Sequence, residues 1–142
     1  MKLIRIYKRG KVLNDRLYEQ LKVLDARVFY GCGNEFLNNR DWWVIEKGNV
    51  IIAYCGCWYN QKVCMFNRAW VHPNYRGKGI QDKMIKTRLK AAKEDLSTVA
   101  ITYITIDNPK SGNNLIKNKF RLYIPSYQYA GSDKIYFSKQ LI

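Results

Sequence analysis

The segment spanning residues 71–82 constrains the fold most, because it changes from a strand into a helix within a few residues. It reads V-H-P-N-Y-R-G-K-G-I-Q-D: a strand end, a proline that ends strand pairing, a turn with two glycines and the start of a basic helix. Gly77 and Gly79 permit the tight curvature by which successive backbone N–H groups converge on an anion. The helix behind them adds unpaired N–H groups and the positive end of its dipole. This local chemistry is equally typical of a phosphate-binding turn and of a solvated loop.

The N-terminal part of the chain predicts one strand followed by two helices. Residues 2–7 alternate in polarity and are expected to form the strand. Apolar residues recur at helical spacing from Leu17 to Val28, so we expect a helix there, with Asn14 or Asp15 as its N-cap. A short second helix is expected within residues 34–40.

The middle of the chain predicts a meander and a long helix. Apolar and aromatic runs joined by short turns, which are typical of antiparallel strands, occupy residues 42–46, 50–58 and 63–71. Residues 77–96 place apolar side chains on one stripe of an otherwise charged helix. The meander would therefore lead directly into the glycine-containing turn.

The C-terminal part predicts three strands and a further helix. Residues 99–106 are β-branched and should form a strand, and residues 111–119 should form a short helix. Two closing strands are expected near residues 121–129 and 134–141. A chain of 142 residues without a linker or internal repeat would bury about two-thirds of its unfolded surface in one core. We therefore expect one domain, 1–142, of the mixed α/β (α+β) class.

Two sequence blocks resemble the GNAT superfamily of N-acetyltransferases. Residues 76–81, R-G-K-G-I-Q, are similar to its acyl-CoA-binding motif, R/Q-x-x-G-x-G/A, which follows a strand ending in a V-x-P-like turn. Many members read N-x-x-A/S…K-x-G-F in a second block, and the matching residues are Asn108, Ser111, Lys117 and Phe120. The resemblance covers about residues 42–123. It implies a GNAT-type mixed, mostly antiparallel sheet of six to seven strands, flanked by about four helices, with central strands that splay apart.

The resemblance also implies acetyl-CoA as co-substrate and assigns residues to bind it. Main-chain groups of Ala69 and Val71 would hold the pantetheine arm and the thioester. Arg76 would add a charged contact to the pyrophosphate. Asn108 would bind the pantetheine arm, although a turn residue before a proline is an equally common use of asparagine. The backbone N–H groups expected to bind the pyrophosphate are those of Gly77, Lys78, Gly79, Gln81 and Asp82.

The catalytic positions depart from the family pattern. Leu115 and Met65 stand where members place a tyrosine acid or a glutamate, and neither side chain can move a proton. Ser111 lies one helical turn before Leu115 and is a candidate catalytic proton relay, whereas helix capping is the more common use of such a serine. Gln81 replaces a small residue, but its side chain can point away from the helix N-terminus, so CoA binding is expected to survive at equal or lower affinity. Other candidate acids are Tyr103, Tyr123 and Tyr127.

The charge balance bears on the acceptor. The net charge of +14, from 25 Lys and Arg against 11 Asp and Glu, exceeds what one CoA explains and favours an acidic partner such as RNA or an acidic protein. We expect an N-acetyltransferase that transfers acetyl directly to an amine. The acceptor itself is unknown, and the alternatives are an aminoacyl-tRNA or another nucleic-acid-linked amine. Outside the enzymes, a non-catalytic CoA- or nucleic-acid-binding module is the competing interpretation. The sequence leaves open whether the chain forms a homodimer.

The apolar runs, the cysteines and the single histidine argue against a membrane protein and against a metal site. No run approaches the ~20 apolar residues of a membrane span, and the start of the chain alternates, so we expect a cytoplasmic protein with no membrane contact. The cysteines lack paired C-x-x-C spacing, and His72 is the only histidine, so no metal site is expected. Cys55 and Cys57 are expected to be small, reduced core residues.

Overall fold

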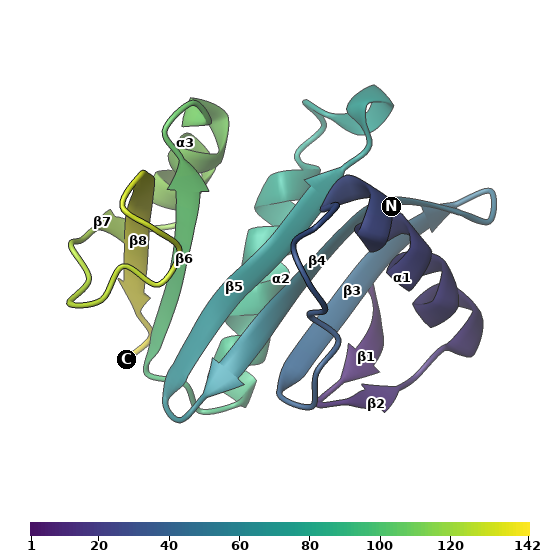
Figure 1. Cartoon of the computed structure of the whole chain (residues 1–142), viewed down its shortest axis with the longest axis horizontal. Coiled ribbons are helices and arrows are strands. Elements are labelled where there is room, and N and C mark those ends of the chain that lie inside the picture. Colours follow the sequence, from purple (N-terminus) through teal and green to yellow (C-terminus); the bar gives the residue numbers. More distant parts are fainter. The chain divides into compact units, whose positions relative to one another are not determined.

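The computed structural model describes residues 1–142, which form strands and helices in mixed order (Figure 1). The elements are β1 (Ile4–Lys8), β2 (Lys11–Val12), α1 (Asp15–Val28), β3 (Arg40–Lys47), β4 (Val50–Asn60), β5 (Val63–Val71), the 3-10 helix η1 (Pro73–Tyr75), α2 (Ile80–Glu94), β6 (Val99–Thr105), α3 (Pro109–Lys117), β7 (Arg121–Leu122) and β8 (Lys134–Gln140). The strands follow the sheet order β2-β1-β3-β4-β5-β6-β8-β7. The β5–β6 pair is parallel, whereas β1–β2, β1–β3, β3–β4, β6–β8 and β7–β8 are antiparallel.

These elements confirm the mixed, mostly antiparallel class but correct the expected numbers. The sheet has eight strands instead of six to seven, because β2 is a pairing of only two residues that leaves no periodic pattern in the sequence. The strand expected near residues 121–129 is present as β7 but covers only Arg121–Leu122. There are three α-helices instead of about four. The helix expected within residues 34–40 is absent, because the Asn34 side chain accepts a hydrogen bond from Phe36 N at 2.9 Å and so forms a local turn that competes with helix.

The chain divides into two compact units. The first comprises Met1–Trp58 and Asn67–Ile80, and the second comprises Tyr59–Phe66 and Gln81–Ile142. Both units contain buried hydrophobic side chains of their own, so each is described by itself. The single domain stays a prediction.

In the first unit, α1 packs on strands β3 and β4 (Figure 1). Asn14 is the N-cap of α1, as expected, and its Oδ1 accepts a hydrogen bond from Leu17 N at 3.0 Å. Leu17 and Leu21 are fully buried against Trp42 and Tyr54, which confirms the helical apolar stripe. Burying side chains of this size contributes about 1.5–3 kcal/mol each.

In the second unit, α3 packs against β6 and β8. A Cβ added to Gly112 of α3 would lie 3.1 Å from Ile104 Cδ1 of β6, so glycine allows a close approach of helix and strand. Strands β5 and β6 pair in parallel, with Val63–Met65 opposite Val99–Ile101. The separation of these two strands beyond this register stays a prediction.

Candidate functional site

The glycine turn between η1 and α2 has the backbone conformation that its sequence predicts. Gly77 and Gly79 have φ values of 76° and 81°, in the left-handed region that side chains other than glycine rarely adopt. No heavy atom lies within 4 Å of a Cβ built on either glycine, so glycine is required for conformation and not for space. The first residue of α2, Ile80, follows at once. The turn is therefore open to a ligand at the point where helix N–H groups are unpaired.

One hydrogen bond to β4 and two local hydrogen bonds hold the chain that leads into this turn. His72 N donates to Ile52 O at 2.8 Å, and His72 Nδ1 accepts from Asn74 N at 3.0 Å. Arg76 Nε donates to Val71 O at 2.9 Å. The expected contact of Arg76 with pyrophosphate therefore falls to its terminal nitrogens, because its Nε fixes the strand end. The Val71 carbonyl keeps one lone pair for the pantetheine arm.

The first turn of α2 carries a carboxylate, Asp82, that two neighbouring side chains hydrogen-bond. Asp82 accepts hydrogen bonds from Lys86 Nζ at 2.6 Å and from Asn118 Nδ2 at 2.7 Å. Lys86 and then Asn118 hold the pKa of Asp82 below its usual range. The side chain is thus directed to these partners, and its backbone N–H is the group that could serve an anion. Gln81 is half-buried beside it.

The second sequence block forms the start of α3, but with different local roles. Asn108 is the N-cap of α3 and accepts from Ser111 N at 3.4 Å, so its Oδ1 has the structural role that the turn alternative assigned to it. Its Nδ2 would be the atom that binds pantetheine, which stays a prediction. Ser111 is half-buried inside the helix and is not its cap, so the capping interpretation was wrong and the catalytic role of Ser111 remains untested. Leu115 is 5% exposed and belongs to the core.

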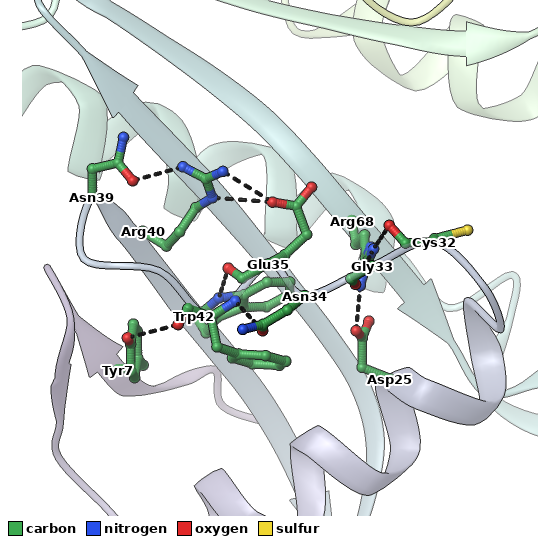
Figure 2. Close-up of polar contacts among 11 residues, drawn as sticks. Tyr7, Asp25, Cys32, Gly33, Asn34, Glu35, Asn39, Arg40, Trp42 and Arg68 are labelled. Carbon is green, nitrogen blue, oxygen red and sulfur yellow. Dashed lines mark hydrogen bonds and ion pairs between the residues drawn. The ribbon is translucent and has the colours of Figure 1, made fainter.

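The irregular segment after α1, residues 31–39, is held by a buried ion pair that no sequence pattern predicted (Figure 2). The Arg68 guanidinium on β5 pairs with the Asp25 carboxylate and donates to Cys32 O and Gly33 O, each at 2.8 Å. Tyr54 donates to Asp25 at 2.8 Å. Burial, together with this carboxylate, raises the pKa of Tyr54, so its hydroxyl stays protonated as the donor. We call residues 31–39 the braced segment.

A second set of contacts holds the same segment further along (Figure 2). Arg40 Nη2 lies 3.0 Å from Glu35 Oε2, and Trp42 Nε1 donates to Glu35 O at 3.3 Å. Tyr7 donates to Phe36 O at 3.2 Å, and the Phe36 ring stacks on Trp42 at 4.7 Å between centroids. Side chains from three strands, β1, β3 and β5, thus fix a segment that has no regular backbone of its own.

A cluster of tyrosines lies at the end of β8 in the second unit. Tyr136 accepts from Ala130 N at 3.0 Å and donates to Gly131 O at 2.7 Å, which fixes the loop before β8. Burial raises the pKa of Tyr129, a residue that sequence reasoning did not select, and neighbouring tyrosines add to the rise. Burial also raises the pKa of Tyr123. Of the acids proposed from sequence, Tyr127 is 77% exposed and makes none of the described ring contacts.

The structure groups the expected CoA-binding residues by unit. Ala69, Val71 and the turn up to Ile80 belong to the first unit, and Gln81, Asp82, Asn108 and Ser111 belong to the second. Their common role in one site stays a prediction. Cys55 and Cys57 are buried and form no disulfide bond. No group of three or more potential metal ligands occurs, and no helix combines the length and apolarity needed to cross a bilayer.

Comparisons with known proteins identify the class. A sequence model of the acetyltransferase (GNAT) family matches residues 7–114, and the chain belongs to this family. Among solved structures, an aminoglycoside 6'-acetyltransferase type Ii is similar over 100% of this chain and 98% of its own, with TM-score 0.77 and 14% identity. ElaA of Escherichia coli is similar over 98% and 99%, with TM-score 0.73 and 13% identity.

A third solved structure, a Bacillus subtilis acetyltransferase in complex with CoA, is similar over 99% of both chains, with TM-score 0.68 and 13% identity. A search of curated proteins by sequence gives no match. At these identities the structural similarities establish the fold, whereas the acceptor has to be argued from this chain's own residues.

Proposed function

We propose that the protein is an acetyl-CoA-dependent N-acetyltransferase that transfers acetyl directly to an amine. Membership of the GNAT family supports acetyl transfer. The single structural observation that carries the proposal is the open turn at Gly77 and Gly79, whose left-handed backbone immediately precedes the N-terminus of α2. Such a turn suits the pyrophosphate of CoA, because it presents backbone N–H groups and the positive helix end without a competing side chain.

The chemistry requires little proton transfer from the protein. The lone pair of a neutral amine attacks the thioester carbon, the carbon–sulfur bond breaks, and CoA leaves as a thiolate while the amine proton passes to water. Leu115 is apolar and buried at the position where the family places an acid, so positioning and backbone hydrogen bonds would supply most of the rate enhancement. This is feasible because a thiolate is a fair leaving group near neutral pH.

Two measurements on the wild-type protein test this function. Titration calorimetry with CoA should show one binding site, and incubation with acetyl-CoA and a panel of amines should release free thiol. The absence of CoA binding would refute the proposal outright. Binding of CoA without thiol release from any amine in the panel would favour the non-catalytic CoA-binding module.

A second candidate acceptor is a nucleic-acid-linked amine, and a cluster of lysines in the second unit favours it. Burial lowers the pKa of Lys139, and the charges of Lys93 and Lys119 lower it further. Lys90 and Lys93 are exposed on α2, whereas Lys86 is engaged by Asp82 at 2.6 Å. Such mutual repulsion would be relieved by a polyanion.

Charge reversal at Lys90 and Lys93 tests this candidate without disturbing Asp82. Wild-type protein should bind single-stranded RNA at low salt, with a logarithmic salt slope of about −0.7 for each phosphate contact, and the Lys90→Glu/Lys93→Glu variant should bind more weakly with a shallower slope. Fluorescence anisotropy measures both quantities. Undetectable RNA binding at low ionic strength would remove this candidate.

A further inference from the structure

Asn67 on β5 carries a buried amide that nothing in the protein satisfies. Its Oδ1 and Nδ2 are both shielded from solvent and have no hydrogen-bond partner. Buried side-chain amides are nearly always paired, because leaving them unpaired costs stability. Asn118 illustrates the usual case, since its Nδ2 donates to Asp82 at 2.7 Å and to Asn114 O at 2.8 Å. Asn67 is therefore an exception that folding does not explain.

Next to Asn67 lie a glycine that makes room for its side chain and a second buried polar group without a partner. A Cβ at Gly56 of β4 would come within 2.7 Å of Asn67 Oδ1 and 2.8 Å of the Trp42 ring, so only glycine accommodates both side chains. Trp58 lies two positions further along β4 and therefore on the same face. Its Nε1 is also buried without a partner, and Arg40 covers its ring at 4.7 Å.

The two carboxylates near these groups are both paired and are not free to bind a cation. Asp25 is paired with Arg68, and Glu35 is paired with Arg40. The unpaired groups are an amide, which donates and accepts, and an indole N–H, which donates. Such a set suits a ligand with a carbonyl oxygen and an N–H group better than it suits a polyamine.

Asn67 also lies close to the expected reaction centre. It precedes Ala69, the strand residue to which we assign the thioester, by two positions, which is about 7 Å along an extended strand. An asparagine side chain spans part of that distance. The amide is thus placed to contact atoms next to an attacking amine instead of the amine itself.

We propose that Asn67 binds the carbonyl-containing unit adjacent to the acceptor amine, so that the acceptors are α-aminoacyl compounds. Asn67 Nδ2 donates to the carbonyl oxygen and Oδ1 accepts an N–H, the pairing that one amide makes with another. No hydrogen bond fixes which way the amide faces, and half a turn about its terminal torsion exchanges Oδ1 and Nδ2, so either atom can face the ligand. Asn67 exchanges no proton in the reaction, and the assignment rests on the proposed acetyl transfer.

Alaninamide and isopropylamine, which share a secondary-carbon amine but differ in the carbonyl unit, test the proposal by thiol release. The quantity compared is kcat/KM for alaninamide divided by kcat/KM for isopropylamine. This ratio should be about tenfold or more higher in wild type than in Asn67→Leu, mainly because KM for alaninamide rises in the variant. Taking the ratio cancels the intrinsic reactivities of the two amines. Equal ratios in the two proteins overturn the proposal, as does CoA binding with turnover of neither amine. Failure to bind CoA would instead overturn the acetyltransferase function.

Thermal unfolding without ligand gives a second, independent test. Leucine has the same number and branching of heavy atoms as asparagine and removes the unpaired amide, so Asn67→Leu should raise Tm by about 3 °C or more. The control Asn118→Leu should lower Tm, because it removes the hydrogen bonds of Asn118 to Asp82 and to Asn114 O. A Tm lowered by Asn67→Leu would mean that the amide serves the fold, and would overturn the proposal even if activity were lost.

Discussion

The glycine turn and the braced segment are both irregular, but they are held in opposite ways. The turn takes its form from its own backbone, through two left-handed glycines and hydrogen bonds to residues next to it in the chain. The braced segment takes its form from distant side chains, chiefly Arg68 on β5 and Tyr7 on β1. A motif of the first kind can be recognised in the sequence, because its own residues determine its form. A segment of the second kind cannot, because its form depends on distant residues that leave no pattern within the segment.

Removal of Arg68 should have the largest effect on stability, and its structural effect should fall on the braced segment and not on the glycine turn. Arg68→Met leaves the buried Asp25 carboxylate without its counter-charge and frees the carbonyls of Cys32 and Gly33. We expect a loss of about 3–5 kcal/mol in the free energy of unfolding, measured by urea denaturation, and faster amide exchange at Cys32. CoA affinity should change little, since the turn does not depend on this pair.

The double variant Asp25→Asn/Arg68→Met is the control for charge. It removes the carboxylate while keeping an acceptor for Tyr54, so part of the lost stability should return. If the double variant is as unstable as the sum of the two single variants, the cost does not come from an uncompensated charge, and the ion pair is not what holds the segment.

A substitution in the turn should have an intermediate effect on stability but a specific one on ligand binding. Gly79→Ala places a side chain at φ 81° with no steric neighbour, so we expect a cost of about 1–2 kcal/mol from backbone strain. CoA affinity should fall in calorimetry, because relief of that strain moves the N–H groups. Gly48→Ala is the matched control, since Gly48 also has positive φ, at 58°, and open space. Equal CoA affinity in the two variants would contradict the role of the turn.

The difference between these two regions also explains which parts of the fold could be predicted from the sequence. The strands β3 to β5, the helix α2 and the turn before it were predicted because periodicity and glycine chemistry are local. The helix expected within residues 34–40 was wrong, because the polarity of that stretch reflects partners on distant strands instead of a helical face. The buried pair of Asp25 and Arg68 could not be found either, because the two residues are far apart in sequence and each has the appearance of an ordinary surface charge.

The candidate site divides in the same way. The family motif identified residues 76–82, but it offered no means to single out Asn67, whose lack of partners is visible only in three dimensions. Helix capping was the common structural role considered for Ser111, whereas Asn108 fills that position. Spacing identifies which block is present, and packing decides which atom within the block is free to act.

The smallest expected effect is the pH dependence of stability that Asp82 contributes. Asp82 lies in the first turn of α2 and contacts both a nearby residue, Lys86, and a distant one, Asn118. Lys86 and Asn118 hold the pKa of Asp82 below its usual range, so the group is ionised in the folded protein at a pH where the unfolded chain already binds its proton. The stabilisation is therefore fully present above the unfolded pKa of about 4 and is lost as pH falls through the lower, folded pKa. The free energy of unfolding should decline more steeply below about pH 4 in wild type than in Asp82→Asn, with the curves parallel near neutrality. Denaturant titrations at successive pH values measure this. Identical slopes at acidic pH would mean that Asp82 is not stabilised by these partners, and that the start of α2 is held, like the turn before it, by the backbone alone.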